Sequence, residues 1–193
     1  MFWRLRPDPA LIDLLARLDG EALLTGPDRD PAEAEIDPVF AAPFGTAIAD
    51  LRVDAGLPRG PDGADPLPGW LALLDRRDPL AMIGEARLHD ATAPDGAGLG
   101  VLLLQNGTEG PDLIGLFTGP TLCVRPEHRG LGYGRALVAA RLMREGALPT
   151  WGHDTPGYSP AGAAAVRGAR ALLLALAAEP KAGTSLWIEC GPF

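Results

Sequence analysis

At 193 residues, with 47% hydrophobic and 22% charged side chains, the chain has the size and composition of one soluble globular domain over residues 1–193, and its length requires no second domain. Its formal net charge of −8 excludes a broad basic surface, so we expect no nucleic-acid partner and favour a cationic acceptor. Its two cysteines exclude a disulfide framework and lack metal-ligand spacing, which predicts a reduced, cytoplasmic setting and no bound metal.

The N-terminal residues predict a strand followed by a helix. Within residues 2–6, Trp3 and Leu5 alternate with Arg4 and Arg6, as in a half-buried strand. Asp8 and Pro9 then supply the cap and first residue of a helix whose leucines share one face and which Gly20 is placed to end. This segment lacks the uninterrupted apolar core of a signal peptide, and no run in the chain approaches the length of a transmembrane helix. We therefore expect no membrane partner.

The next third of the chain is the least regular. Residues 26–68 are dense in proline, glycine and aspartate, with a second helix indicated over residues 38–51. An apolar run at 70–74, a polar turn and a second apolar run at 80–88 together predict a β-hairpin, with Glu85 on its second strand. By its composition alone, the irregular region reads as a surface excursion.

Strand and turn signals continue from this hairpin toward the middle of the chain. Residues 99–104 predict a strand, and Asn106 with Gly107 marks a turn. Residues 112–124 form a longer apolar stretch. That stretch is long enough to hold an extra strand, beyond the one that leads into residue 124, or an enlarged hairpin.

Two further helices and a last strand are predicted toward the C-terminus. Apolar residues over 135–147 form two patches, which indicates a helix covered on both sides. Residues 148–158 contain either the next strand or a loop in its place, and Ser159 then caps a helix that Pro160 opens. Residues 184–189 read as a terminal strand.

The most informative stretch is residues 121–137, which reads as strand, loop and helix. Gly130, Gly132 and Gly134 let the backbone curl around a bulky ligand where a Cβ would obstruct it. The unpaired amides and positive dipole end of the following helix favour a phosphate. An NTPase loop would need Lys and then Ser or Thr after Gly134, and a dinucleotide fingerprint would need glycine in place of Leu137. Neither motif fits.

The pattern that fits is Arg/Gln-x-x-Gly-x-Gly/Ala, met by Arg129, Gly132 and Gly134 after Val-Arg-Pro-Glu-His. The stretch resembles the acyl-CoA-binding signature of the GNAT N-acetyltransferase superfamily. The resemblance implies an α/β (α+β) GNAT fold, with a mixed, mostly antiparallel, splayed central sheet flanked by helices. It also implies acetyl-CoA as cosubstrate and transfer of its acetyl group to a primary amine of a small molecule or peptide, by direct attack in a ternary complex. A homodimer is compatible with this reading.

The resemblance also assigns cosubstrate contacts residue by residue. In such proteins the strand before the loop splays from the next strand and leaves backbone amides for the pantetheine arm, at positions that match Leu122, Cys123 and Val124. The apolar strand around Cys123 favours packing of its thiol over a nucleophilic role. The loop positions expected to hold the pyrophosphate are Arg129, Gly130, Leu131, Gly132, Tyr133, Gly134 and Arg135, the last with its side chain either on the 3′-phosphate or in solvent.

The general acid is less clearly marked than the loop. The family often places a tyrosine seven residues beyond an asparagine near the next helix start, to protonate the departing thiolate. That pattern is absent, because counting from Ser159 puts Val166 where the tyrosine would be. Tyr158, just before the helix, is the remaining candidate acid.

Several residues are candidates for the general base. Glu85 is one, and His153, with Asp154 beside it, has a suitable intrinsic pKa. Glu127 and His128 more often face water in this motif. The missing tyrosine pattern keeps an alternative open, a catalytically idle GNAT-fold module that binds acyl-CoA as a structural or assembly component.

Overall fold

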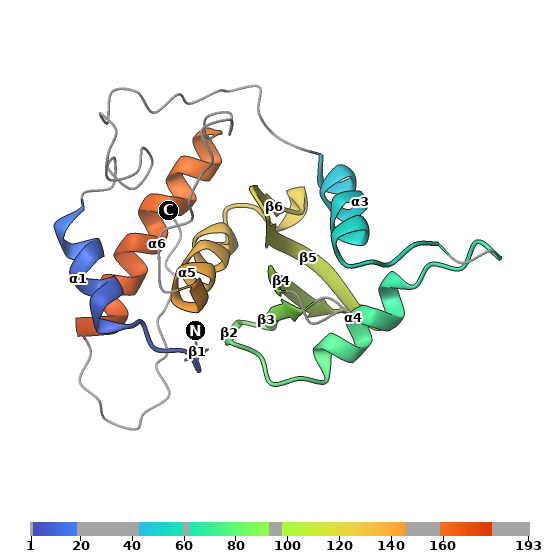
Figure 1. Ribbon diagram of the computed structural model, residues 1–193, viewed down its shortest axis with the longest axis horizontal. Helices are drawn as coiled ribbons and strands as arrows, with labels where there is room; N and C mark the ends of the chain where they lie inside the picture. The colour runs from blue at the N-terminus through green and yellow to red at the C-terminus, as the bar shows by residue number, and fades with distance from the viewer. Residues whose placement is uncertain (1, 19–42, 60–61, 93–97, 146–158, 179–193) are drawn as a thin grey trace. The chain divides into compact units, whose positions relative to one another are not determined.

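The computed structural model describes residues 2–18, 43–59, 62–92, 98–145 and 159–178 (Figure 1). These residues divide into two compact units. One unit holds residues 2–4 and the described part of 43–133, and the other holds residues 5–18, 134–145 and 159–178. The prediction of a single domain over the whole chain stays a prediction.

The first unit is built on a six-stranded sheet in the order β1-β2-β3-β4-β5-β6. All neighbouring strands in it pair antiparallel. The strands are β1 (Phe2–Trp3), β2 (Ala81–Ile83), β3 (Ala86–Thr92), β4 (Gly98–Asn106), β5 (Pro111–Thr118) and β6 (Thr121–Val124). An antiparallel sheet with separate helices is an α+β arrangement. The mixed and splayed features of the predicted sheet stay predictions, because the expected strand at 184–189 lies outside the described residues.

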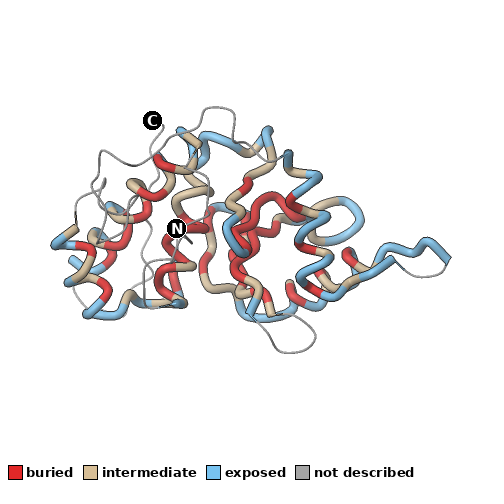
Figure 2. The backbone as a smooth tube through the Cα atoms, turned by 45° about the horizontal axis from the view of Figure 1, so that its top comes forward, coloured by how far each residue is buried: buried red, intermediate tan, exposed pale blue. Residues whose placement is uncertain are grey.

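Two helices, α3 (Phe44–Asp54) and α4 (Leu67–Asp75), pack on the sheet of the first unit (Figures 1 and 2). Leu102 and Leu104 alternate along β4 and present side chains to the same face. Apolar burial of this kind contributes about 25 cal/mol per Å². The buried cluster that joins this face to the two helices contains Ala47, Leu51, Leu67, Leu71, Leu74, Ala91, Leu102, Leu104, Leu113, Leu116 and Cys123.

The second unit contains α1 (Pro9–Arg17), α6 (Pro160–Ala178) and α5 (Tyr133–Glu145) from its second residue onward. Both predicted N-caps are confirmed: the Ala10 amide donates to the Asp8 carboxylate at 2.7 Å, and the Gly162 amide donates to Ser159 Oγ at 3.1 Å. Arg170 Nε on α6 donates to the carbonyls that end α1, those of Leu15 at 2.9 Å and Leu18 at 2.7 Å. These bonds satisfy carbonyls that have no partner inside α1.

The described part of α6 corrects one sequence expectation. Its 19 residues are long and apolar enough to cross a membrane, by length and composition alone. The statement that no run approaches that length is therefore wrong for α6. A core helix of a soluble protein can have the same length and composition, and α6 buries Val166, Ala169 and Leu173. This property does not assign α6 to a membrane.

The predicted hairpin over residues 70–88 is wrong. Residues 70–74 belong to α4, in which Leu67, Leu71 and Leu74 are buried at helical spacing. The Asp65 carboxylate accepts from the Leu67 amide at 3.0 Å and helps to start the helix. A five-residue apolar window cannot distinguish a strand from a turn of buried helix, which explains the error.

The second arm of that prediction is itself a hairpin. β2 and β3 pair with Ile83 opposite Ala86, so Gly84 and Glu85 form a two-residue turn. Gly84 has a φ of +61°, a value that tight hairpin turns require. Residues with a Cβ rarely adopt it. Glu85 is therefore an exposed turn residue and not part of a strand.

Other predicted boundaries differ by a few residues. The first helix ends at Arg17, with Leu18 as its C-cap, before the predicted stop at Gly20. The second predicted helix is α3, which continues past residue 51 to Asp54. The strand at 99–104 and the turn after it are confirmed as β4 and residues 107–110, and the long apolar stretch that follows divides into β5 and β6.

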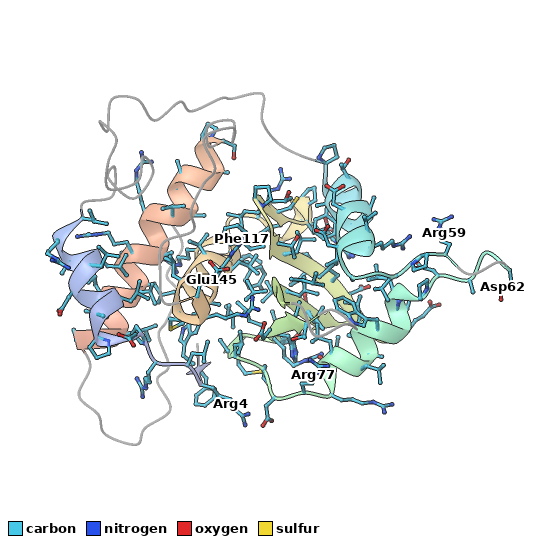
Figure 3. The ribbon with its side chains drawn as sticks, viewed as in Figure 1. Arg4, Arg59, Asp62, Arg77, Phe117 and Glu145 are labelled. Carbon is cyan, nitrogen blue, oxygen red and sulfur yellow. The ribbon has the colours of Figure 1, made fainter. Side chains whose placement is uncertain are left out.

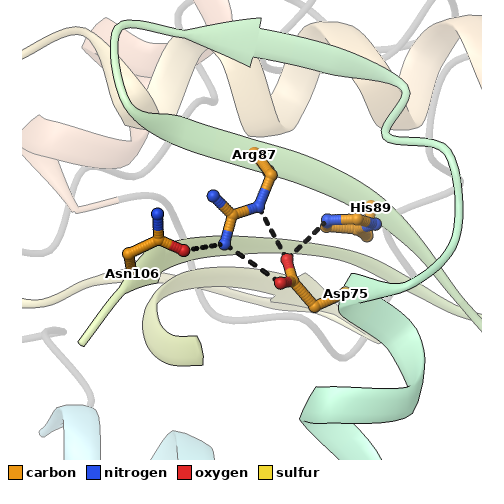
Figure 4. A network of polar contacts seen from close by, with 4 residues as sticks. All are labelled: Asp75, Arg87, His89 and Asn106. Carbon is orange, nitrogen blue, oxygen red and sulfur yellow. Dashed lines mark hydrogen bonds and ion pairs between the residues drawn. The ribbon is translucent and has the colours of Figure 1, made fainter. Parts of the chain in front are cut away.

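A partly buried polar network links the end of α4 to the sheet (Figure 4). The guanidinium of Arg87 on β3 donates Nε and Nη2 to the two carboxylate oxygens of Asp75, at 2.7 Å and 3.1 Å. Its Nη2 also donates to Asn106 Oδ1 at the end of β4, at 2.7 Å. The planar fork of arginine suits such a paired carboxylate.

His89 lies beside the same carboxylate and is only 1% exposed. Its Nε2 is 3.4 Å from Asp75 Oδ1, but no described group makes a well-aligned hydrogen bond to either ring nitrogen. Burial lowers the pKa of His89 below its ordinary value, and the charge of Asp75 opposes this only in part while Arg87 and Arg77 add to it. The imidazole of His89 is therefore neutral in the folded protein at neutral pH.

This network predicts a loss of stability on acidification. The unfolded chain binds a proton at His89 at a higher pH than the folded chain does, so the contribution of neutral His89 is complete above about pH 6.5. It falls as the pH drops from there through the lower pKa of the folded state. Urea unfolding of the wild type and of His89→Gln between about pH 7.5 and about pH 5 should show a weaker pH dependence in the variant. Parallel curves for the two proteins would contradict this.

Candidate functional site

The strand, loop and helix predicted for residues 121–137 are confirmed. β6 leads into a short 3-10 turn, Pro126–His128, and α5 begins at Tyr133. The turn is closed by two backbone hydrogen bonds, from the His128 amide to the Arg125 carbonyl at 2.9 Å and from the Arg129 amide to the Pro126 carbonyl at 3.2 Å. Residues 129–132 have no regular secondary structure and connect this turn to the helix. We call them the open segment.

The three glycines of the motif have different structural roles. Gly130 and Gly132 have φ values of +80° and +77°, a region that residues with a Cβ rarely adopt. A Cβ at Gly130 would have no atom within 4 Å, so open space adjoins the backbone there. Gly134 is inside α5, where a Cβ would come within 3.3 Å of Ala165 Cβ on α6. Gly134 therefore serves helix packing, which its place in the motif did not predict.

β6 is the last strand of the described sheet, and its backbone groups alternate in direction. The Arg125 amide donates to the Ile114 carbonyl on β5 at 2.9 Å, and the β5–β6 register continues this pairing at Cys123. In an antiparallel ladder the intervening residues turn their N–H and C=O groups away from the partner strand. Leu122 and Val124 therefore direct their amides away from β5.

Cys123 differs from its two neighbours. The alternation turns its amide toward β5, and its side chain is 6% exposed within the apolar cluster under α3 and α4. Burial raises the pKa of the Cys123 thiol, and the nearby Arg129 charge opposes this only in part. The thiol is thus packed as a small apolar group, as the sequence indicates.

Arg129, the first residue of the motif, folds back onto the strand. Its Nε donates to the Val124 carbonyl at 3.1 Å. The side chain is otherwise exposed. The carbonyl that it contacts is one that the strand alternation turns away from β5.

A second arginine, Arg125, anchors the start of the loop and was not singled out from the sequence. Its guanidinium lies 5.5 Å from the centre of the Phe44 ring at the start of α3. Its Nη1 is 3.8 Å from Asp112 Oδ2, and its Nε is 3.7 Å from Glu127 Oε1. The only sequence signal is an arginine between a strand residue and a proline, which has many structural uses.

The charge of Glu85 acts on Tyr133, although the two residues are far apart in the sequence. Burial raises the pKa of Tyr133, and the Glu85 carboxylate raises it further. The tip of the β2–β3 turn thus places a negative charge near the tyrosine that ends the loop. The ring of His128 lies 6.3 Å from the ring of Tyr133, at an interplanar angle of 43°.

The remaining predicted site residues divide into two groups. Leu131 lies in the open segment and is 54% exposed, and Arg135 lies in the first turn of α5, where its side chain runs along α6 at Gly168. His153 and Tyr158, two of the three catalytic candidates, lie outside the described residues. Within the described ranges no group of three or more His, Cys, Asp or Glu side chains could hold a metal ion.

Two local features of this stretch favour an anion. The first amides of α5 have no intrahelical partners. Gly130 and Gly132, at positive φ, set the orientation of the peptide groups that precede the helix. Comparison of the chain with protein-family models, curated proteins and solved structures finds no match in any of the three. The functional argument therefore rests on the residues of the loop and on their geometry.

Proposed function

We propose that this chain is an N-acetyltransferase of the GNAT type, which transfers an acetyl group from acetyl-CoA to a primary amine of a small molecule or peptide. The observation that carries the proposal is the loop before α5. It combines the sequence pattern Arg-x-x-Gly-x-Gly with two glycines at positive φ and a helix of 13 residues that begins immediately after them. A pyrophosphate fits such a junction, because backbone amides and the positive end of the helix dipole both favour it.

The edge of β6 supports the same reading of the ligand. The outward amides of Leu122 and Val124 lie on the strand that leads into the loop. A pantetheine arm carries amide carbonyls, so it can accept hydrogen bonds from a strand edge. The proposed ligand would lie with its phosphates at residues 130–134 and its thioester along β6.

The proposed reaction requires few protein groups. The amine nitrogen attacks the thioester carbonyl carbon, the carbon–sulfur bond breaks, and the amine proton is transferred while the thiolate leaves and is protonated. Among the described residues Glu85 is the base candidate that we favour over Glu127 and His128, and its charge raises the pKa of Tyr133. His153 and Tyr158 stay candidates for base and acid. The protein's net charge of −8 suits a cationic amine, which it would attract at long range.

Thiol release tests this proposal directly. The full chain is incubated with acetyl-CoA and a panel of small and peptide amines, and free CoA thiol is measured against a no-enzyme control. We expect CoA production that depends on an amine and follows the number of acetylated product molecules. Tight acetyl-CoA binding without turnover would instead support an idle binding module, for which the missing tyrosine pattern is the specific argument. Absence of acetyl-CoA binding would overturn both readings.

A further inference from the structure

The peptide group between Val124 and Arg125 is held from both sides. Its N–H donates to the Ile114 carbonyl on β5 at 2.9 Å, and its carbonyl accepts from Arg129 Nε at 3.1 Å. It is the last peptide of the strand before Pro126 begins the turn. Its orientation therefore sets the direction in which the chain leaves the sheet.

Arg129 closes the turn with its backbone as well as its side chain. Its amide donates to the Pro126 carbonyl at 3.2 Å, while its Nε reaches back to Val124. The hydrogen bond to Val124 places the guanidinium of Arg129 beside the strand end, and its charge opposes the rise in the pKa of Cys123. The residue that follows it is Gly130, the first of the two glycines at positive φ. The side chain of Arg129 thus links the end of β6 to the start of the open segment.

We propose that Arg129 is a positioning residue, which presets the loop through the Val124 carbonyl and does not act by supplying charge to the phosphates of the ligand. The part of this inference that concerns ligand binding rests on the proposed function. A donor nitrogen at the ε position is the property that the role requires. Charge is not required.

Two substitutions of Arg129 distinguish the effect of its hydrogen-bond donor from the effect of its positive charge. In Arg129→Gln the amide nitrogen occupies the same point of the side chain as Arg Nε, so the variant keeps a donor and loses the charge. Arg129→Met loses both and keeps a side chain of similar length. Arg59→Met is the matched control for loss of a positive charge. Arg59 is exposed on the segment between α3 and α4, with its side chain directed away from the sheet (Figure 3).

Hydrogen exchange of the ligand-free protein provides the first readout. In Arg129→Met the amides of residues 128–134 should exchange about tenfold faster than in the wild type, because the bond that braces the turn is lost. Arg129→Gln should be within about threefold of the wild type, and Arg59→Met should be unchanged. Unchanged exchange in Arg129→Met would overturn the inference whatever the ligand is.

Calorimetric titration with CoA provides the second readout. Arg129→Met should bind about tenfold more weakly, Arg129→Gln should stay within about threefold of the wild type, and the ratios should be the same at low salt and at about 1 M salt, where charge contacts are screened. Equal losses in both variants that fade at high salt would show a charge contact and overturn the inference. Absence of CoA binding by the wild type would overturn the proposed function, and the exchange experiment would still decide the role of Arg129.

Discussion

Gly132→Val is expected to abolish CoA binding while leaving the protein folded. Gly132 has a φ of +77°, and a residue with a Cβ is disfavoured there by about 1–2 kcal/mol, more for a branched side chain. The loop would relieve this strain by changing its backbone path. The amides that the proposal assigns to the pyrophosphate would then no longer converge. Calorimetric titration of CoA into the wild type and the variant measures the effect, which we expect to exceed a hundredfold loss of affinity.

The matched control is Gly63→Val. Gly63 has the same φ of +77°, lies in open space and is on the exposed segment before α4. Both valines therefore impose a similar backbone strain, but only one lies in the proposed ligand site. Gly63→Val should bind CoA with the affinity of the wild type. Wild-type affinity in Gly132→Val, or an equal loss in both variants, would contradict the role given to the loop.

Gly100→Ala should cause the largest loss of stability among the substitutions considered. Gly100 is on β4 with a φ of +140°, and a Cβ there would lie 2.1 Å from the Phe117 carbonyl oxygen and 3.1 Å from the Thr118 Cα. Both atoms belong to the backbone of the neighbouring strand, so they cannot be moved by a side-chain rotation. β4 and β5 would have to separate locally, which we expect to lower the free energy of unfolding by about 3 kcal/mol or more.

Gly69→Ala is the control for the same chemical change. Gly69 is inside α4, and a Cβ there would meet no atom within 4 Å. Alanine is the better helix former, so this variant should be more stable by about 0.5–1 kcal/mol. Urea unfolding compares the midpoints of the two variants with that of the wild type. A midpoint for Gly100→Ala equal to the wild-type value would contradict the close approach of β4 and β5.

Local chemistry made several elements predictable from the sequence. Asp8 before Pro9 and Ser159 before Pro160 combine a capping oxygen with a proline that suits the first helical turn, and both helices begin there. The strand at β4 and the turn after Asn106 follow from short-range signals of the same kind. In each case the structure depends on neighbours in the sequence.

The errors occurred where burial determines the structure. The apolar residues of α4 were read as a strand because the five residues from 70 to 74 show no period of their own. Its helical face becomes visible only when Leu67 is included, since that residue, Leu71 and Leu74 meet the sheet together. Glu85 was placed on a strand, although the positive φ of Gly84 before it turns the chain back on itself.

The sequence predicted where the candidate site lies, but not the structural role of each residue in it. The motif indicated that residues 129–134 form a loop before a helix, and they do. It did not indicate that Gly134 packs against Ala165, that Arg125 lies over Phe44, or that Glu85 lies near Tyr133. Each of these pairs joins residues that are distant in the sequence. A pattern of neighbouring residues carries no information about them.

The most direct test of the account is hydrogen exchange of the full chain with and without CoA. The account predicts slower exchange, saturable with CoA concentration, at the outward amides of Leu122 and Val124 and at the amides of residues 130–134. The amide of Cys123, which points to β5, should change less. Saturable protection at other residues with none in the loop, or no protection at any CoA concentration, would contradict the claim that this loop is an acyl-CoA site.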